Sequence, residues 1–252
     1  MKTQDYPTFM KEFTPLAKMM KMNATVWENA RVVMVDIPVD KKAVRKVLPH
    51  YMKLTEDAMA SLFIADYPTN IFTVPYKEAA LLLHVKTPMG KGVHCAWMVV
   101  DDDTALIYGR EVLGFPKKLA DFTFEDNGNR LKAGLKRRGH ELFSMDAIIR
   151  ETEPSPPPMF ANKMFNVRNS TKYPLFHSIW MFRPGERVKT FNHADVDLKI
   201  TESENDPIYR LVSGNPKNGR VVTLDILNGT YLVPVGLTTF RWYVMSHTMR
   251  YK

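Results

Sequence analysis

The chain has 252 residues, of which 45% are hydrophobic and 25% are charged. This is an ordinary globular composition, with enough apolar residues to bury a sizeable core. Its one cysteine, Cys95, excludes disulfides within the chain and is typical of a reducing cytosol, where we expect the protein to act. No apolar run approaches the roughly 20 residues of a membrane span, and the first residues lack a signal-peptide pattern.

The net charge of +8 has several readings. Basic proteins often bind nucleic acid or membrane surfaces, and a positive charge also attracts a small anionic substrate such as a keto acid. Here the basic residues are spread along the chain, and their densest cluster, residues 132–138, is short. We therefore expect mostly solvated charge, with neither nucleic acid nor membrane as a partner.

The first part of the chain predicts helices around one strand. Apolar residues within 9–20 recur near helical spacing, which predicts an amphipathic helix covering the rest of the fold or a neighbouring subunit. Residues 31–37 alternate between apolar and other side chains, as in a half-buried strand. Asp40 is the predicted N-cap of a helix that runs to Leu48.

Short strands separated by turns are predicted for the remainder. They are expected at residues 61–65, 79–85, 93–100, 105–108, 122–125, 131–137, 142–150, 196–201, 208–212, 221–227 and 231–244. The stretch Asp126-Asn127-Gly128-Asn129 predicts a hairpin turn, since Asn-Gly tolerates positive φ. Proline-rich residues 154–158 predict a crossover between two halves of one domain, 1–252. Together these features favour a mainly β fold, a closed or sandwiched antiparallel architecture.

No metal site is expected. The run Asp101-Asp102-Asp103 is better explained as a turn, and no second cluster completes a site with His94 and Cys95. No feature of the sequence indicates a cofactor either.

The adjacent lysines in Phe115-Pro116-Lys117-Lys118-Leu119 carry the strongest chemical signal. A lysine amine is nucleophilic only when neutral, and an apolar wall or a second ammonium favours that form. Neighbouring side chains in an extended stretch point opposite ways. We therefore expect apolar surroundings to activate Lys117 more than the charge of Lys118 does, with Lys118 paired to a carboxylate elsewhere. The simpler alternative is a pair of solvated surface lysines.

The string from Gly109 to Ala120 resembles the Schiff-base segment of the acetoacetate decarboxylase family. In that family the lysine after the proline forms an imine and the next lysine is its cationic neighbour, a standard example of an activated lysine. The resemblance implies these roles for Lys117 and Lys118. It extends over most of the chain through residues 29–31, 40–49, 76–78 and 230–234.

The resemblance implies a cone-like antiparallel β-barrel with a few peripheral helices and a homo-oligomeric, cofactor-free lyase. The implied reaction is decarboxylation of a small β-keto acid, with acetoacetate giving acetone and CO₂ as the default. One alternative is a Schiff-base aldolase or dehydratase of the same fold that acts on a larger keto acid. A further alternative is a non-catalytic basic β-barrel that binds an anionic ligand.

Two charged residues on apolar strand faces are further candidates. Arg31 shares its face with three β-branched residues at positions 33, 35 and 37, so it needs a partner or a function. Its guanidinium suits a substrate carboxylate or a buried glutamate. Glu78 shares its face with Ala80 and Leu82 and is expected as a proton carrier or as the partner of Arg31.

The motif supplies the remaining candidates. Arg110 and Glu111 are expected to form an ion pair that positions the lysine loop, and Phe115 to form a wall of the pocket. Decarboxylases of the family carry a further acidic residue upstream of Tyr-x-Glu, but the matching residues 61–65 contain none. Phe63 or Ile64 places apolar bulk there, which leaves proton handling and substrate choice open.

Overall fold

The structure is a computed structural model that describes residues 24–159, 163–168 and 176–252. Strands dominate these residues: β1 (Thr25–Pro38), β2 (Lys53–Leu54), β3 (Met59–Tyr67), β4 (Thr69–Asn70), β5 (Tyr76–Thr87), β6 (Gly90–Val100), β7 (Lys117–Leu119), β8 (Asp121–Asp126), β9 (Arg130–Arg137), β10 (His140–Thr152), β11 (Met164–Arg168), β12 (Phe176–Ile200) and β13 (Lys217–Thr239). The helices are α2 (Lys41–Val47), α3 (Asp103–Glu111) and α4 (Phe240–Arg250), with a 3₁₀ turn, η1 (Ile208–Arg210).

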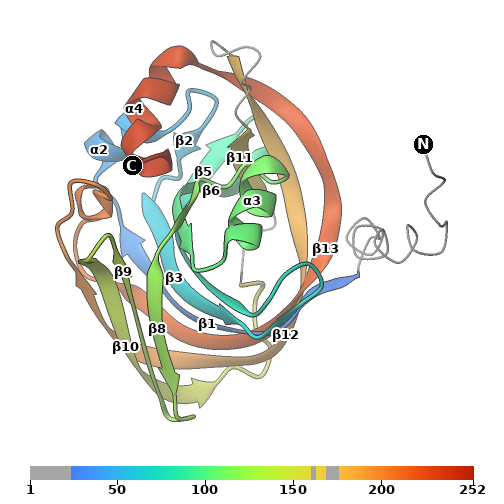
Figure 1. Ribbon diagram of the computed structural model, residues 1–252, viewed down its shortest axis with the longest axis vertical. Coiled ribbons are helices and arrows are strands. Elements are labelled where there is room, and N and C mark those ends of the chain that lie inside the picture. The colour runs from blue at the N-terminus through green and yellow to red at the C-terminus, as the bar shows by residue number, and fades with distance from the viewer. Residues whose placement is uncertain (1–23, 160–162, 169–175) are drawn as a thin grey trace, which may run out of the picture.

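Part of the sheet closes into a ring in the order β11-β6-β5-β3-β1-β13-β12, because β12 pairs back with β11. The long strands β12 and β13 curve around one side of the molecule, and β12 continues into pairing with β10, followed by β9 and β8 (Figure 1). Pairing is antiparallel except where β7 and β11 each join β6 in parallel. The predicted mainly β, cone-like fold is confirmed.

Alternation along the strands creates two apolar cores, one on each face of the ring. On β1, Ala30, Val32 and Met34 belong to an inner core, which also contains Ala105 of α3. Figure 1 shows α3 within the opening of the ring. Residues 33, 35 and 37 belong to an outer core, which is shared with β9, β10 and the terminal helix α4. The functional consequence is that a strand residue's position decides which core receives its side chain.

Most predicted elements are confirmed, and the local chemistry is as expected. The Asp40 carboxylate accepts from the amide of Ala43 at 2.7 Å and caps α2. Gly128 adopts φ +84° in the turn between β8 and β9, the conformation that the Asn-Gly signal requires. The expected helix within residues 9–20 lies outside the described residues.

Two strand predictions are wrong, and a third is correct only as far as Thr239, because helix caps or a tight turn end the extended backbone. Residues 105–108 belong to α3, whose N-cap Asp102 accepts from the Ala105 amide at 2.7 Å. Residues 208–210 form η1. The last predicted strand ends at Thr239, whose hydroxyl accepts from the Trp242 amide and opens α4. The run Asp101-Asp102-Asp103, which is expected from the sequence to form a turn, therefore supplies the N-cap of α3.

None of the described helices has the length and apolar character needed to cross a membrane. Within the described ranges, no group of three or more His, Cys, Asp or Glu side chains is arranged to hold a metal ion.

Ring closure depends partly on a buried histidine. His94 in β6 is 2% exposed, and its Nδ1 donates to the carbonyl of Phe165 in β11 at 2.7 Å. Burial lowers the pKa of His94 to about 4, with the charge of Arg250 acting in the same direction and the hydrogen bond opposing. The folded protein therefore holds this imidazole neutral well below the pH at which the unfolded chain is protonated.

This linkage predicts acid sensitivity. Between pH of about 6.5 and about 4 the unfolded chain binds a proton at His94 before the folded chain does, so the free energy of unfolding falls as pH falls. Protonation of His94 in the unfolded chain should lower the free energy of unfolding by about 3 kcal/mol near pH 4 and should have no effect above about pH 6.5. Urea unfolding of His94→Gln across this range should show a flatter pH profile than the wild type. His140→Gln, on an exposed part of β10, is the control, and an unchanged slope in His94→Gln would contradict the assignment.

Candidate active site

The short strand β7 directs its two adjacent lysines, Lys117 and Lys118, to opposite faces of the sheet. It pairs in parallel with β6, so that Lys117 lies opposite Met98 and Lys118 opposite Val99. Met98 belongs to the inner core and Val99 to the outer core. Both lysines are 5% exposed, which excludes the solvated-surface alternative. The predicted opposite orientation of the two side chains is confirmed.

Lys117 meets a carboxylate inside the ring. Its Nζ lies 2.7 Å from Oε2 of Glu78, and the two side chains are 5% and 9% exposed. Glu78 belongs to β5 on the same face as Ala80 and Leu82, as expected. The rings of Tyr76 and Phe115 flank the amine, with centroids 5.6 Å and 5.8 Å from Nζ. An amine and a carboxylate are therefore in direct contact in apolar surroundings.

Two tyrosines complete the surroundings of Glu78. Burial, reinforced by the neighbouring Glu78 carboxylate, raises the pKa of both Tyr67 and Tyr76 well above the usual value. The Tyr67 hydroxyl also hydrogen-bonds to Glu78, while the Tyr76 hydroxyl accepts from Trp27 Nε1 at 2.8 Å. Sequence reasoning missed Tyr67, although it shares an alternating strand face with the predicted pocket residue Phe63.

These side chains border a cavity of about 260 Å³ inside the ring. Of the two residues expected to replace the family's further acid, Phe63, 2% exposed, lines this cavity, whereas Ile64 belongs to the outer core. The described lining is dominated by apolar and aromatic side chains, and its charged members are Lys117 and Glu78 alone. Its aromatic members are Trp27, Phe63, Tyr67, Phe72, Tyr76, Tyr108, Phe115 and Phe182. The cavity is thus an apolar chamber with one ion pair.

Helix α3 places Lys117 through a glycine and an arginine. A Cβ on Gly109 would lie 2.5 Å from both Cδ and Cε of Lys117, so the lysine stem passes directly over bare backbone. Arg110 Nη1 donates to the carbonyls of Lys117 at 2.8 Å and of Arg250 at 3.1 Å. Arg110 therefore positions the lysine strand, as expected, but through backbone carbonyls.

The expected ion pair between Arg110 and Glu111 is absent from the salt bridges among the described residues. Glu111 is exposed, and its backbone carbonyl accepts from Arg168 Nη2 at 2.7 Å. Glu111 does not belong to the described lining of the cavity. The physical reason is its place at the end of α3, where the side chain points to solvent and the free carbonyl takes the partner.

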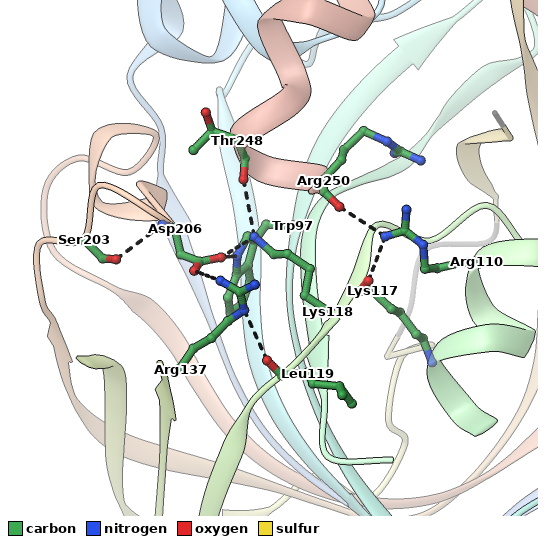
Figure 2. A network of polar contacts seen from close by, with 10 residues as sticks. All are labelled: Trp97, Arg110, Lys117, Lys118, Leu119, Arg137, Ser203, Asp206, Thr248 and Arg250. Carbon is green, nitrogen blue, oxygen red and sulfur yellow. Dashed lines mark hydrogen bonds and ion pairs between the residues drawn. The ribbon is translucent and has the colours of Figure 1, made fainter. Parts of the chain in front are cut away.

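Lys118 enters a separate buried network on the outer face (Figure 2). Its ammonium pairs with Oδ1 of Asp206 and also donates to the carbonyl of Thr248. Arg137 Nη1 donates to Oδ2 of Asp206 at 2.7 Å, and Trp97 Nε1 donates to Oδ1 at 2.8 Å. The expected carboxylate partner of Lys118 is therefore Asp206, which is 1% exposed and 88 residues away in the sequence.

This network fastens the lysine strand to the rest of the fold. Arg137 Nε also donates to the carbonyl of Leu119 at 3.1 Å, so β7 is held from both ends. Burial lowers the pKa of Lys118 to about 8, against the attraction of Asp206. Lys118 is therefore held in a buried network in which one carboxylate, Asp206, faces two cations.

The expected pairing of Arg31 with Glu78 is wrong. Arg31 Nε lies 2.7 Å from Oδ2 of Asp126, and its Nη1 donates to Thr223 Oγ1 at 3.0 Å. Its side chain is 20% exposed and follows the outer-core face of β1. Glu78 faces the inner core. The sheet itself separates the two charges, so Arg31 contacts neither Lys117 nor the cavity.

Comparison with known proteins defines the class. The model of the acetoacetate decarboxylase (ADC) family matches residues 6–233, so the chain belongs to the acetoacetate decarboxylase family. An acetoacetate decarboxylase of Acidiphilium cryptum (strain JF-5) is 29% identical over 92 residues. That match spans 36% of this chain and only 37% of the relative.

Solved structures share the fold. An acetoacetate decarboxylase of Legionella pneumophila subsp. pneumophila str. Philadelphia 1 matches with a TM-score of 0.72 at 18% identity, covering 84% of this chain and 87% of its own. An acetoacetate decarboxylase-like enzyme of Sphingomonas wittichii RW1 has a TM-score of 0.72 at 15% identity, covering 86% and 96%. The enduracididine biosynthesis enzyme MppR, in complex with pyruvate, has a TM-score of 0.70 at 16% identity, covering 84% and 91%.

Gly109 offers a direct test of this geometry. Alanine normally favours a helix over glycine by about 0.5–1 kcal/mol, so Gly109→Ala should fold. Its new methyl group should displace the Lys117 side chain, and a misplacement near 1 Å can cost about 10²-fold in rate. Borohydride trapping of acetone on Lys117 should therefore fall by at least ten-fold.

Gly134→Ala on β9 is the matched control, because its nearest neighbour is a hydroxyl of Thr123 at 3.2 Å that can shift. Wild-type trapping in Gly109→Ala would contradict the close approach of α3 to Lys117.

Proposed function

We propose that this member of the family is a Schiff-base lyase that decarboxylates a β-keto acid without a cofactor, with acetoacetate as the simplest substrate. The observation that carries the proposal is the contact of 2.7 Å between Lys117 Nζ and Glu78 Oε2 in a cavity with no other described charge. The contact supplies a nucleophile and a proton carrier, and the apolar lining supplies the medium.

Imine formation starts with proton transfer. Glu78 takes a proton from the Lys117 ammonium, which leaves a neutral amine beside a neutral carboxylic acid. An apolar chamber favours this neutral pair relative to water. The amine then attacks the ketone carbon of the substrate, and the carbinolamine loses water as Glu78 returns a proton to the departing oxygen. The product is an iminium ion on Lys117.

Carbon dioxide leaves next. The bond between the α-carbon and the carboxylate breaks, and its electron pair moves into the iminium to form a neutral enamine. Apolar walls replace the hydration of the carboxylate, and the charge that they destabilise disappears as CO₂ forms. Glu78, which gave up its proton during dehydration, takes a new proton from solvent and passes it to the enamine carbon. Water then hydrolyses the resulting iminium to release the ketone and the Lys117 ammonium.

The absence of a guanidinium from the described cavity lining favours decarboxylation over a reaction that keeps the carboxylate. An aldolase or dehydratase acting on a 2-keto acid would hold a carboxylate throughout its cycle, and a retained buried anion needs a cation. That second candidate is favoured by one observation, since Phe63, one of the two residues expected at the place of the family's further acid, puts an aromatic ring on the cavity wall. Trapping with pyruvate as well as acetoacetate separates the two.

Borohydride reduction during turnover tests the proposal. With acetoacetate, mass mapping should place one acetone-derived unit on the peptide that contains Lys117, and CO₂ should be released before reduction. Lys117→Arg keeps the charge but offers no nucleophilic amine, so it should abolish both signals while the protein stays folded. Pyruvate adducts that go on to aldol products, without CO₂ release from any β-keto acid, would favour the aldolase alternative. An unmodified Lys117 would favour the non-catalytic one.

Glu78 should matter for turnover more than for trapping. General acid–base groups typically contribute about 10²–10⁴-fold, so Glu78→Gln should slow CO₂ release by at least about 10²-fold. Without its counterion the buried Lys117 amine favours the neutral form, so the imine should still form, more slowly without its proton carrier, and borohydride trapping should still reach completion.

Glu141→Gln, which disrupts an exposed pair with Lys136, is the matched control and should behave as wild type. A rate in Glu78→Gln within a few-fold of wild type would remove Glu78 from the mechanism.

A further inference from the structure

We infer that the substrate of this site carries an apolar tail of about six carbons, as a ring or a chain, on the ketone side of the β-keto acid. This inference rests on the proposed function and specifies its substrate class. Three features of the cavity support it: its size, the chemistry of its walls and the small residues of α3 next to Lys117.

The cavity is larger than the reacting group needs. A chamber of about 150 Å³ lined by apolar side chains holds a benzene molecule, whereas this one measures about 260 Å³. Once a ring or six-carbon chain is placed, roughly 110 Å³ remains for the keto-acid group that reacts with Lys117. Acetoacetate alone would leave most of the apolar wall in contact with water, and burial of that wall is worth about 25 cal/mol per Å².

The side chains that line the cavity favour an apolar substrate tail over a polar one. Trp27, Phe72 and Tyr108 form a continuous aromatic group, with ring centroids 5.3 Å apart for Trp27 and Phe72 and 5.5 Å apart for Phe72 and Tyr108. The indole nitrogen of Trp27 is already bonded to the Tyr76 hydroxyl, and the Tyr67 hydroxyl to Glu78. The other polar side chains of the described lining away from the ion pair are Tyr108 and Asn228. A polar tail would therefore lose its hydrogen bonds to water with few partners in return.

Helix α3 leaves space for this tail. Gly109 lies against the methylenes of Lys117, and Ala105 lines the same cavity one turn earlier in the helix. One turn corresponds to about 5.4 Å along the axis, so Ala105 lines a part of the cavity about one turn of α3 away from the Lys117 stem at Gly109. A small side chain at this position keeps the chamber open where the tail would lie.

Reductive trapping measures the preference without requiring decarboxylation. Wild-type protein is titrated with acetone, methyl hexyl ketone, benzylacetone and a methyl hexyl ketone that ends in a hydroxyl, then reduced with borohydride and mapped by mass. Each buried methylene is worth about 0.8 kcal/mol, or about four-fold in affinity. Methyl hexyl ketone or benzylacetone should half-saturate Lys117 at a concentration at least ten-fold below acetone. The hydroxyl-ended ketone should lose most of this gain.

The corresponding β-keto acids are then assayed for CO₂ release. If tailed ketones are trapped preferentially but no β-keto acid releases CO₂, the decarboxylase activity is refuted and the preference for an apolar tail is supported. If acetone is trapped as well as or better than the tailed ketones, and acetoacetate is turned over as fast as or faster than the tailed acids, the proposed tail is wrong and the proposed decarboxylase activity stands. If no ketone is trapped on Lys117, both proposals fail. A preference for benzylacetone over the alkyl ketone, or the reverse, identifies the tail as aryl or alkyl.

A variant locates the tail. Ala105→Leu adds bulk to the cavity, so the ratio of tailed-ketone to acetone trapping should fall by about ten-fold. Ile107→Leu is the matched control on the same helix, because Ile107 is 56% exposed. An unchanged ratio in a folded Ala105→Leu protein would contradict the placement of the tail along α3.

Discussion

The architecture of the site depends on the alternation of side chains along the three-residue strand β7, whose two lysines are both buried. Because β7 is extended, Lys117 and Lys118 must point to opposite faces, and because both faces are cores, both ammonium groups are buried. A buried charge without a partner is strongly destabilising. The fold therefore supplies each lysine with its own carboxylate, Glu78 on the inside and Asp206 on the outside.

The two pairs differ in what surrounds them, and this difference separates chemistry from anchoring. Asp206 accepts from Lys118, Arg137 and Trp97, so its lone pairs are committed and its position is fixed. Glu78 faces a chamber with space for a ligand. A carboxylate that can exchange a proton with a neighbouring amine and then with a bound molecule is suited to proton transfer. The Lys118–Asp206 pair helps to fix β7, whereas the Lys117–Glu78 pair borders the chamber in which we propose that the substrate binds.

The sequence predicts the parts of this arrangement that depend on local periodicity. The opposite directions of Lys117 and Lys118 and the shared face of Glu78, Ala80 and Leu82 follow from a period of two. Alternation does not reveal which face of a strand is the inside of a ring, so the sequence alone does not show that the sheet separates Arg31 from Glu78. Asp206 could not be named, because its contact with Lys118 joins segments 88 residues apart.

The most direct test of this division of labour is the turnover of Lys118→Met. Removing Lys118 leaves Asp206 with Arg137, so the buried charges balance and the protein should fold. If Lys117 alone carries the chemistry, the rate of CO₂ release from a β-keto acid in Lys118→Met should stay within about ten-fold of wild type. Removal of a proton-transfer group would lower this rate by about 10²-fold or more. A folded Lys118→Met protein as inactive as Lys117→Arg would contradict the account.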